Sequence, residues 1–531
     1  MKSLIHWDYN NNLTIYANWL TVPYESTNDI YFQEEVIGVV DLIYGKDYSL
    51  FLPLDYISSE QMFLYYYIVD EGDEVILTNS FGDSLIPWKY KTDQVIYAKI
   101  LLTISTEEDL LALDLKKEYV LTNDILINMF TESIDSHVDS GFTGVIHGQG
   151  HKLIFNRQQA SLFKNNYGRI RNLQIVISDI YFTPLNYSAG FVVNNYGLIE
   201  DVTFEAKIVN SSLGIMFAGI TGFNYGIINH ASSIITLDDT FTGRVSIAGV
   251  AHDNAGIIDK SYASLSIKSK NLREQTASIG GISVNQTTTG KITNSYTSLN
   301  IDSNFGVKET YYSFLTIGGI VADNKGDISD TYSTGIVSFN LSVTPNRNSS
   351  AAQNSPTEAR VYVGGFIGVH ESGTIKRSYS NINLSNITVI VKAHILQQNS
   401  RAHANVMIGG FIGYLHPNAT ITNSFSTSNI NATLIAEEIL ANGTRPANFE
   451  RLTLYGFSLQ TDFVFDVYVT EEQILKVEQA VNSFIINAEA TSETNLKSSN
   501  WQLEHLFNND PLYWTVLEGF YPSYNWNHKN K

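Results

Sequence analysis

The sequence predicts an all-β protein whose main part is a solenoid of stacked parallel coils. Between residues 160 and 425 one phrase recurs eight times, from SLFKNNYGRI through GFVVNNYGLI and GGIVADNKGDI to GGFIGYLHPNATI. Self-similarity of this kind indicates one supersecondary unit stacked on copies of itself. Only 16 % of the residues are charged. The β-branched and aromatic residues that take part of their place favour strands.

Short alternating segments before the repeats predict a small β-rich module. Residues 21–100 contain EEVIGVVDLIYG, QMFLYYYIVDE and QVIYAKI, and residues 1–20 end on a similar strand, LTIYANW. Together with YGKDYSLFLP, these two endings resemble the Listeria–Bacteroides repeat, a β-rich module strung in tandem in bacterial surface proteins. Residues 1–20 would then be the tail of a preceding repeat and residues 21–100 one repeat. The sequence departs from that family at Tyr65–Tyr67, in place of Gly-Trp-Tyr, and at Ile100, in place of a closing Trp.

Residues 101–125 carry the clear helix signal of the chain. Thr106 can cap the helix, and Asp109 three residues later is an Asp variant of the capping box. A strand pattern and the glycine-rich FTGVIHGQGHKLIF follow. This order, with the paired Gly and the Ser-Tyr of the repeats, resembles bacterial surface proteins that carry the GLUG motif. The resemblance implies a right-handed parallel β-helix, with an N-terminal cap at 101–155, coils at 156–450 and a C-terminal cap at 451–531.

Stacking of the coils would place equivalent residues about 4.8 Å apart in ladders. We expect an interior aliphatic ladder of Ile170, Ile199, Ile228, Ile258, Ile292, Ile328, Ile375 and Ile421. Four residues later, the later coils alone offer an aromatic ladder of Tyr262, Tyr296, Tyr332, Tyr379 and Phe425. We interpret it as partly buried aromatic packing, with a sugar-stacking stripe as the alternative. The glycine two residues before each of the first seven Ile residues suits a positive φ or a close backbone approach, and Ala419 takes its place in the eighth repeat. In five repeats an Asn two residues earlier favours the turn.

The spacing of the repeats grows from 29 to 47 residues along the chain, and the extra residues enter after the aromatic ladder. We expect β-hairpin arms at 335–363 and 381–410 that stack into a side sheet. Their polar tips are the candidate ligand-binding residues: Asn346, Arg347, Asn348, Gln397, Gln398, Asn399 and Arg401. After residue 450, YVTEEQILKVEQAVNSFI has helical spacing. That helix is expected to cover the open end of the solenoid.

Composition excludes several classes of partner. The net charge of −20 disfavours nucleic acids and anionic membranes. The absence of cysteine excludes disulfides and thiolate metal sites. No apolar run is long enough to span a bilayer. MKSLIHWD does not have the pattern of a signal peptide. If the protein is exported, we expect this chain to be a fragment of a longer one.

Chemistry-bearing residues give weak signals. Asp323, Asp327 and Asp330 are metal-ligand candidates, but their spacing matches no established calcium loop and favours a turn with exposed acids. His137, His147 and His151 flank the glycine hairpin, where a surface position is favoured over a metal site. A carbohydrate-cleaving site needs clustered carboxylates on one outward face. Asp201 and Asp330 occupy equivalent places but in distant coils, so the alignment shows no such cluster. We expect no cofactor.

These observations favour a bacterial adhesin or stalk, secreted or displayed on the cell surface, that binds a glycan or a protein through the side face of its coils. A monomer is expected, without nucleic-acid binding and without membrane insertion in this chain. A polysaccharide lyase or glycoside hydrolase is the first alternative, and a ligand-free spacer is the second. The identity of the ligand and the mode of anchoring stay open.

Overall fold

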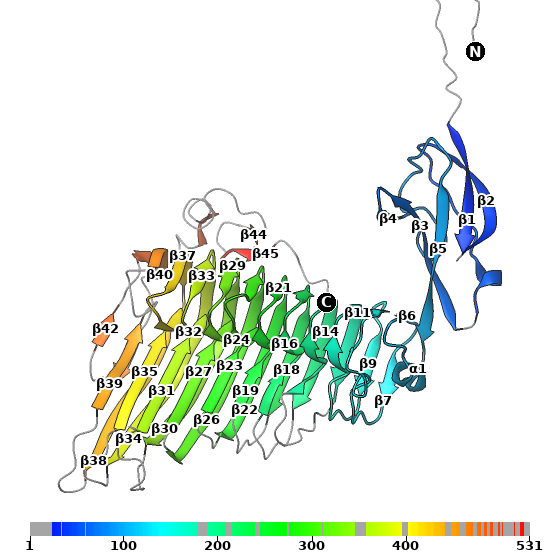
Figure 1. Cartoon of the computed structure of the whole chain (residues 1–531). Coiled ribbons are helices and arrows are strands. Elements are labelled where there is room, and N and C mark those ends of the chain that lie inside the picture. Colours follow the sequence, from blue (N-terminus) through cyan, green and yellow to red (C-terminus); the bar gives the residue numbers. More distant parts are fainter. Residues whose placement is uncertain are drawn as a thin grey trace, which may run out of the picture. The chain divides into compact units, whose positions relative to one another are not determined.

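The computed structural model describes residues 24–455 except 33, 59, 179, 181–187, 209–214, 239–244, 273–275, 311, 346–356, 396–401 and 441–447, together with short pieces between 464 and 524. The chain divides into two compact units, residues 1–103 and 104–531. Both units are built of strands, which confirms the all-β prediction (Figure 1). Within the described ranges, none of the helices has the length and apolarity that crossing a membrane requires.

The first unit is a small mixed sheet. Its elements are β1 (Glu25–Phe32), β2 (Glu35–Ile43), the short 3-10 helix η1 (Leu54–Tyr56), β3 (Gln61–Asp70), β4 (Asp73–Ile76) and β5 (Val95–Ile104). β1 pairs antiparallel with β2 and parallel with β5, and β3 pairs antiparallel with β4 and β5. Trp88 and Tyr66 are buried at its centre with their polar ends satisfied, because Trp88 Nε1 donates to Ser26 Oγ at 2.8 Å and Tyr66 Oη to the Phe51 carbonyl at 2.8 Å.

The second unit begins with the capped helix that the sequence predicts, in a shorter form. α1 runs over Glu107–Leu111, with the Thr106 hydroxyl accepting from the Asp109 amide and the Asp109 carboxylate accepting from the Thr106 amide. The rest of the expected segment is strand, at β5 and at β6 (Glu118–Leu121). β7 (Ile125–Ile127), β8 (Val145–His147) and β9 (Lys152–Phe155) follow and pair in parallel with β6, β7 and β11.

From residue 163 each coil contributes one or two strands to the first of three parallel sheets and one strand to each of the others; we call them sheets I, II and III (Figure 1). Sheet I holds β11 (Arg169–Ile177), β14 (Leu198–Ile208), β17 (Ile227–Asn229), β18 (Ser232–Asp238), β21 (Ile257–Asp259), β22 (Tyr262–Leu272), β25 (Lys291–Thr293), β26 (Tyr296–Thr310), β29 (Asp327–Ser329), β30 (Tyr332–Pro345), β33 (Gly373–Lys376), β34 (Tyr379–Ile395), β37 (Ala419–Ser426), β38 (Ile430–Leu440), β40 (Val464–Thr470), β41 (Leu475–Glu478) and β43 (Glu489–Thr491).

The other two sheets have shorter strands. Sheet II holds β12 (Ser188–Ala189), β15 (Ile215–Ala218), β19 (Val245–Ala248), β23 (Thr276–Gly280), β27 (Tyr312–Gly318), β31 (Thr357–Gly364), β35 (Ala402–Gly409), β39 (Asn448–Tyr455) and β42 (Ser483–Ile485). Sheet III holds β10 (Phe163–Asn166), β13 (Val192–Asn195), β16 (Thr221–Asn224), β20 (Ala251–Asn254), β24 (Ser283–Gln286), β28 (Val321–Asn324), β32 (Ile367–His370) and β36 (Ile412–Leu415). A separate antiparallel pair, β44 (Trp514–Thr515) and β45 (Ser523–Tyr524), lies near the end of the chain.

Both predicted ladders are confirmed by the strand register. All eight Ile residues pair in sequence from Ile170 to Ile421, and each is 0 % exposed. Tyr262, Tyr296, Tyr332, Tyr379 and Phe425 likewise lie on consecutive rungs. The ring centroids of Tyr332 and Tyr379 are 4.9 Å apart with an interplanar angle of 2°. Equal side chains on equal rungs therefore stack in contact along the body.

The recurring asparagine does more than favour a turn. Asn166, Asn195, Asn224 and Asn254 are fully buried and pair on successive rungs of sheet III. Each side-chain amide donates to the next side-chain carbonyl, at 2.8, 2.9 and 2.9 Å. A buried polar side chain is tolerated when its donors and acceptors are matched, and here identical neighbours match one another.

The turn glycines are required by close approach of the backbone. A Cβ on Gly197 or Gly256 would lie 2.1 Å from the carbonyl oxygen of the glycine one coil earlier. Gly373 alone among the seven predicted positions has a positive φ, of 86°. The left-handed conformation occurs instead two residues after the ladder Ile, at Asn172, Asp201, His230, Lys260, Asn294, Asp330, Arg377 and Asn423.

The predicted fold class, a right-handed β-helix solenoid with hairpin arms and a helical C-terminal cap, is wrong as stated. The structure has three all-parallel sheets that close around one interior, and every pairing among the described strands between residues 104 and 491 is parallel. β30 and β31 belong to sheets I and II and pair with the coils before and after, so the extra residues widen both sheets and form no hairpin.

The end of the body also differs from the prediction. Part of the segment expected to be a helical cover is strand, at β41 and β42, which pair in parallel with β38 and β39. The hydrogen-bonding edge left by the preceding coil favours continued pairing over a helix. The predicted hairpin tips, from Asn346 to Asn348 and from Gln397 to Arg401, lie outside the described residues.

Candidate functional site: a cleft between sheets II and III

Sheets II and III meet at a sharp corner that paired glycines make possible. A Cβ on Gly318 or Gly364 would lie 1.8 Å from the carbonyl oxygen three residues later, on Val321 or Ile367. Only glycine therefore fits the turn from sheet II into sheet III. The small side chains of Ala218, Ala248, Val284 and Ala322 form a separate buried cluster between the ends of the two sheets. This corner brings outward-facing residues of both sheets together.

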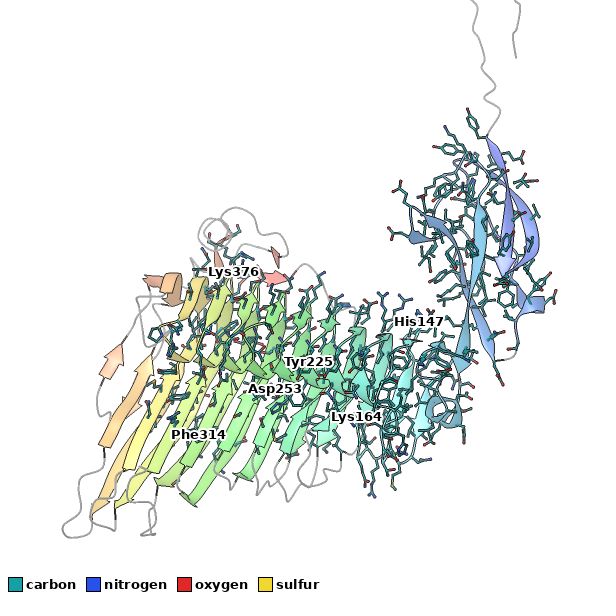
Figure 2. The ribbon with its side chains drawn as sticks, viewed as in Figure 1. His147, Lys164, Tyr225, Asp253, Phe314 and Lys376 are labelled. Carbon is teal, nitrogen blue, oxygen red and sulfur yellow. The ribbon has the colours of Figure 1, made fainter. Side chains whose placement is uncertain are left out.

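A cleft of about 440 Å³ opens at this corner over the later coils. Its lining residues are Phe314, Thr316, Asp323, Arg360, Tyr362, Val369, Glu371, Asn405, Tyr414 and His416. Phe314, which is labelled in Figure 2, marks the β27 side of the cleft. In this region Leu315, Val361 and Val406 are buried, so alternation along each strand turns the residues beside them outward.

The lining follows from the register of the strands. Phe314, Arg360 and Asn405 occupy one column of sheet II. Thr316 and Tyr362 occupy the next column, and Asp323, Val369 and Tyr414 share a column of sheet III. The cleft is thus built from three successive coils, whose sheet II strands are each seven or eight residues long. Earlier sheet II strands have two to five residues, and among them β23 reaches the first column at Thr276, which pairs with Phe314.

Aromatic and polar groups alternate on the walls. The rings of Tyr362 and Tyr414 stack across the corner with centroids 5.3 Å apart and an interplanar angle of 26°. The Asn405 side-chain amide donates to the Tyr362 hydroxyl at 3.2 Å. The Arg360 guanidinium lies 5.5 Å from the centroid of the Phe314 ring, a cation–π contact. The walls therefore offer flat apolar faces beside hydrogen-bonding groups.

Two carboxyl groups line the same cleft. Asp323 is half-buried on β28, and its Oδ1 is buried without a hydrogen-bond partner in the described structure. The pKa of Asp323 is raised to about 6, mainly by burial and also by the charge of Glu371, while Lys325 acts in the opposite direction. Lys325 Nζ lies 3.1 Å from Glu371 Oε2. Glu371 also raises the pKa of the Lys325 ammonium by hydrogen bonding.

A second polar cluster lies at the same corner two coils earlier. Ser246 Oγ is 2.7 Å from His252 Nε2, and His252 Nδ1 is 2.5 Å from Asp253 Oδ2, with Asp253 labelled in Figure 2. The order of groups is that of a serine nucleophile, a base and an orienting acid. Ser246 and His252 are only 1 % and 3 % exposed. A substrate carbonyl cannot reach the Ser246 oxygen, so we assign these contacts to packing of the corner.

The sequence candidates are dispersed. Asp323 lies in the cleft, Asp327 accepts from the Thr374 amide at 3.0 Å, and Asp330 forms an ion pair with Arg377. Among the described residues, no group of three His, Asp or Glu side chains is placed to hold a metal ion. His147 accepts from Arg171, while His137 and His151 contact Glu132 and Asp124.

Alignment on the Ile and Tyr ladders missed the cleft. The pair Asp323 and Glu371 is not on one rung, because Asp323 aligns with Val369 and Glu371 follows two residues later. Counting from the paired glycines gives the signal: Asp323, Val369 and Tyr414 each lie four residues after the second glycine. The ladder alignment shows no cluster of carboxylates, whereas the structure brings Asp323, Glu371, Lys325 and Arg360 to one corner.

Comparison with known proteins gives little beyond distant likeness. No family model matches the chain, and no curated protein matches it, so the GLUG and Listeria–Bacteroides resemblances have no support beyond the residues quoted. Solved structures give distant matches, including the following two. One is a candidate immunoglobulin A1 protease from Bacteroides ovatus, 14 % identical, covering 80 % of this chain and 93 % of that one with a TM-score of 0.28. The other, an IgA1 protease, is 12 % identical and covers 81 % and 31 % with a TM-score of 0.20. Likeness at these TM-scores carries no argument about the present chain.

Proposed function

We propose that the chain is an extracellular bacterial binding protein whose corner cleft, lined by Tyr362, Tyr414, Asn405 and Asp323, holds a short carbohydrate chain. The observation that carries the proposal is the mixed lining of a cavity of about 440 Å³. A pyranose ring presents C–H faces that pack on aromatic rings and hydroxyls that need donors and acceptors at its rim. Ligand sites generally combine apolar walls with a few well-placed polar groups.

The shape of the cleft favours a chain over a single sugar. Its walls come from three successive coils, and coils repeat about every 4.8 Å, so the lining extends along the body axis. Charges of both signs are present, from Arg360 and Lys325 and from Glu371 and Asp323, and this balance favours a neutral glycan. The location outside the cell is part of the same proposal.

The test is binding of the full chain to neutral hexasaccharides: cellohexaose, chitohexaose, mannohexaose, maltohexaose and galactohexaose. We expect one of them to bind, and Tyr414→Ala to weaken its affinity about tenfold, which corresponds to about 1.4 kcal/mol. Tyr196→Ala is the matched control, because Tyr196 is a stacked, 44 % exposed tyrosine on an earlier coil. No binding to any hexasaccharide, or equal affinity for Tyr414→Ala and the intact chain, would contradict the proposal.

A further inference from the structure

The cleft holds its two carboxyl groups in different surroundings. No donor satisfies the buried Oδ1 of Asp323 in the described structure, whereas Lys325 approaches Glu371 at 3.1 Å. The remaining charged or titratable groups that line the cleft are Arg360, His416 and the hydroxyls of Tyr362 and Tyr414. A carboxyl without donors is poorly stabilised as an anion, because hydrogen bonds to the charged form are what favour ionisation. The two groups are therefore differentiated before any ligand enters.

The direction of the Asp323 shift agrees with that geometry. Its pKa of about 6 is raised by burial first and by Glu371 second. A large fraction of Asp323 is then protonated near pH 6, so its carboxyl can donate a proton. Pairs of titratable groups whose environments differ in this way commonly divide the roles of acid and base.

We propose that the cleft cleaves a glycosidic bond of the bound carbohydrate, with Asp323 as general acid and Glu371 as general base. The proposal rests on carbohydrate binding in the same cleft. It assigns both roles to side chains that line the cavity, Asp323 on β28 and Glu371 directly after β32 on the next coil, with the Tyr362 and Tyr414 rings beside them.

The reaction is a hydrolysis. The Asp323 carboxyl gives its proton to the glycosidic oxygen while the bond from the anomeric carbon to that oxygen breaks, and the leaving sugar departs as an alcohol. A water molecule attacks the anomeric carbon, and the Glu371 carboxylate takes its proton. One water is consumed, no oxidant is needed, and proton exchange with solvent restores both groups.

The experiment incubates the intact chain with the hexasaccharides named above and measures new reducing ends together with binding. We expect release from the best-bound sugar. Asp323→Asn and Glu371→Gln should each lower the rate at least about 100-fold, the range for loss of an acid or base, while binding stays within about threefold. These amides keep the shape of the cleft, and circular dichroism checks that the variants fold.

The pH dependence separates a catalytic role from a structural one. Because Asp323 must be protonated, kcat/KM should fall about tenfold per pH unit above pH 6. His416→Asn is the control for the imidazole that lines the same cleft, and it should leave this fall in place. Binding of a hexasaccharide without any cleavage, or full activity of Asp323→Asn, would overturn this inference and leave carbohydrate binding intact. Absence of binding would overturn both.

Discussion

The early coils, up to Asn254, and the later coils, from Tyr262, share one interior but stack different side chains around it. Both halves use the buried Ile ladder. The early half adds a fully buried asparagine ladder and an exposed stack of Tyr167, Tyr196 and Tyr225. In the later half the same column continues as Gln286, Asn324, His370 and Leu415, so only one of its four residues is an asparagine. It also carries the half-buried tyrosine ladder and longer sheet II strands.

The difference shows where such a body can vary. The buried Ile rungs are constrained by every neighbour at once, and Ile persists there from coil to coil. Positions that face outward are constrained only by the rungs above and below. The cleft occurs in the later half, where sheet II strands of seven and eight residues carry the Phe314 and Arg360 side chains. Widening a coil therefore adds surface without disturbing the interior.

The largest expected effect comes from breaking the asparagine ladder. Asn224→Ala removes the acceptor of Asn195 and the donor to Asn254. Each buried group left without a partner costs about 1–3 kcal/mol, so we expect a loss of about 3 kcal/mol or more. Guanidinium unfolding followed by far-UV circular dichroism measures it. Asn194→Ala, at the half-exposed neighbouring position, should cost less than about 1 kcal/mol, and equal costs for the two variants would refute the ladder as a stabilising element.

The two tyrosine stacks give a smaller contrast. Tyr332 stacks between Tyr296 and Tyr379 at 5.0 and 4.9 Å, and Tyr196 stacks between Tyr167 and Tyr225 at 4.7 and 4.9 Å. The ring distances in the two stacks are similar, but the burial of the central tyrosines differs, since Tyr196 is 44 % exposed. We expect Tyr332→Ala to cost about 2–3 kcal/mol and Tyr196→Ala about 1 kcal/mol. The same unfolding measurement compares them, and a reversed order would show that stacking outweighs burial.

The smallest effect is expected at the left-handed bend. Lys260 has φ of 46°, a conformation that costs a non-glycine residue about 1–2 kcal/mol. Lys260→Gly removes that cost but gives the unfolded chain more freedom, worth about 0.5–1 kcal/mol. The net change should be a stabilisation below about 1 kcal/mol, seen as a small rise in the unfolding midpoint. A clear destabilisation would mean that the Lys260 side chain itself holds the bend.

The interior register could be predicted from the sequence because Gly-x-Ile marks the same point of every coil. Residues 335–363 could not be placed, since an arm that folds back and a strand that extends a sheet show the same alternation. Hydrogen-bond partners decide between them, and these lie in neighbouring coils. The proximity of Asp323 and Glu371 was missed for a related reason. The two residues lie on adjacent coils at positions that do not align, because Asp323 pairs with Val369.

The glycine column sets how this protein can change in length. A Cβ at Gly226 would lie 2.2 Å from the Gly197 carbonyl oxygen, and the same conflict recurs at Gly168 and Gly256. A Cβ at one of these positions would push against the backbone of the preceding coil, although Ala419, which pairs with Gly373, carries one in the last repeat. Duplication or loss of one complete coil preserves every such contact. We therefore expect the chain to gain or lose whole repeats of about 30 residues more easily than it tolerates substitution of one of these glycines.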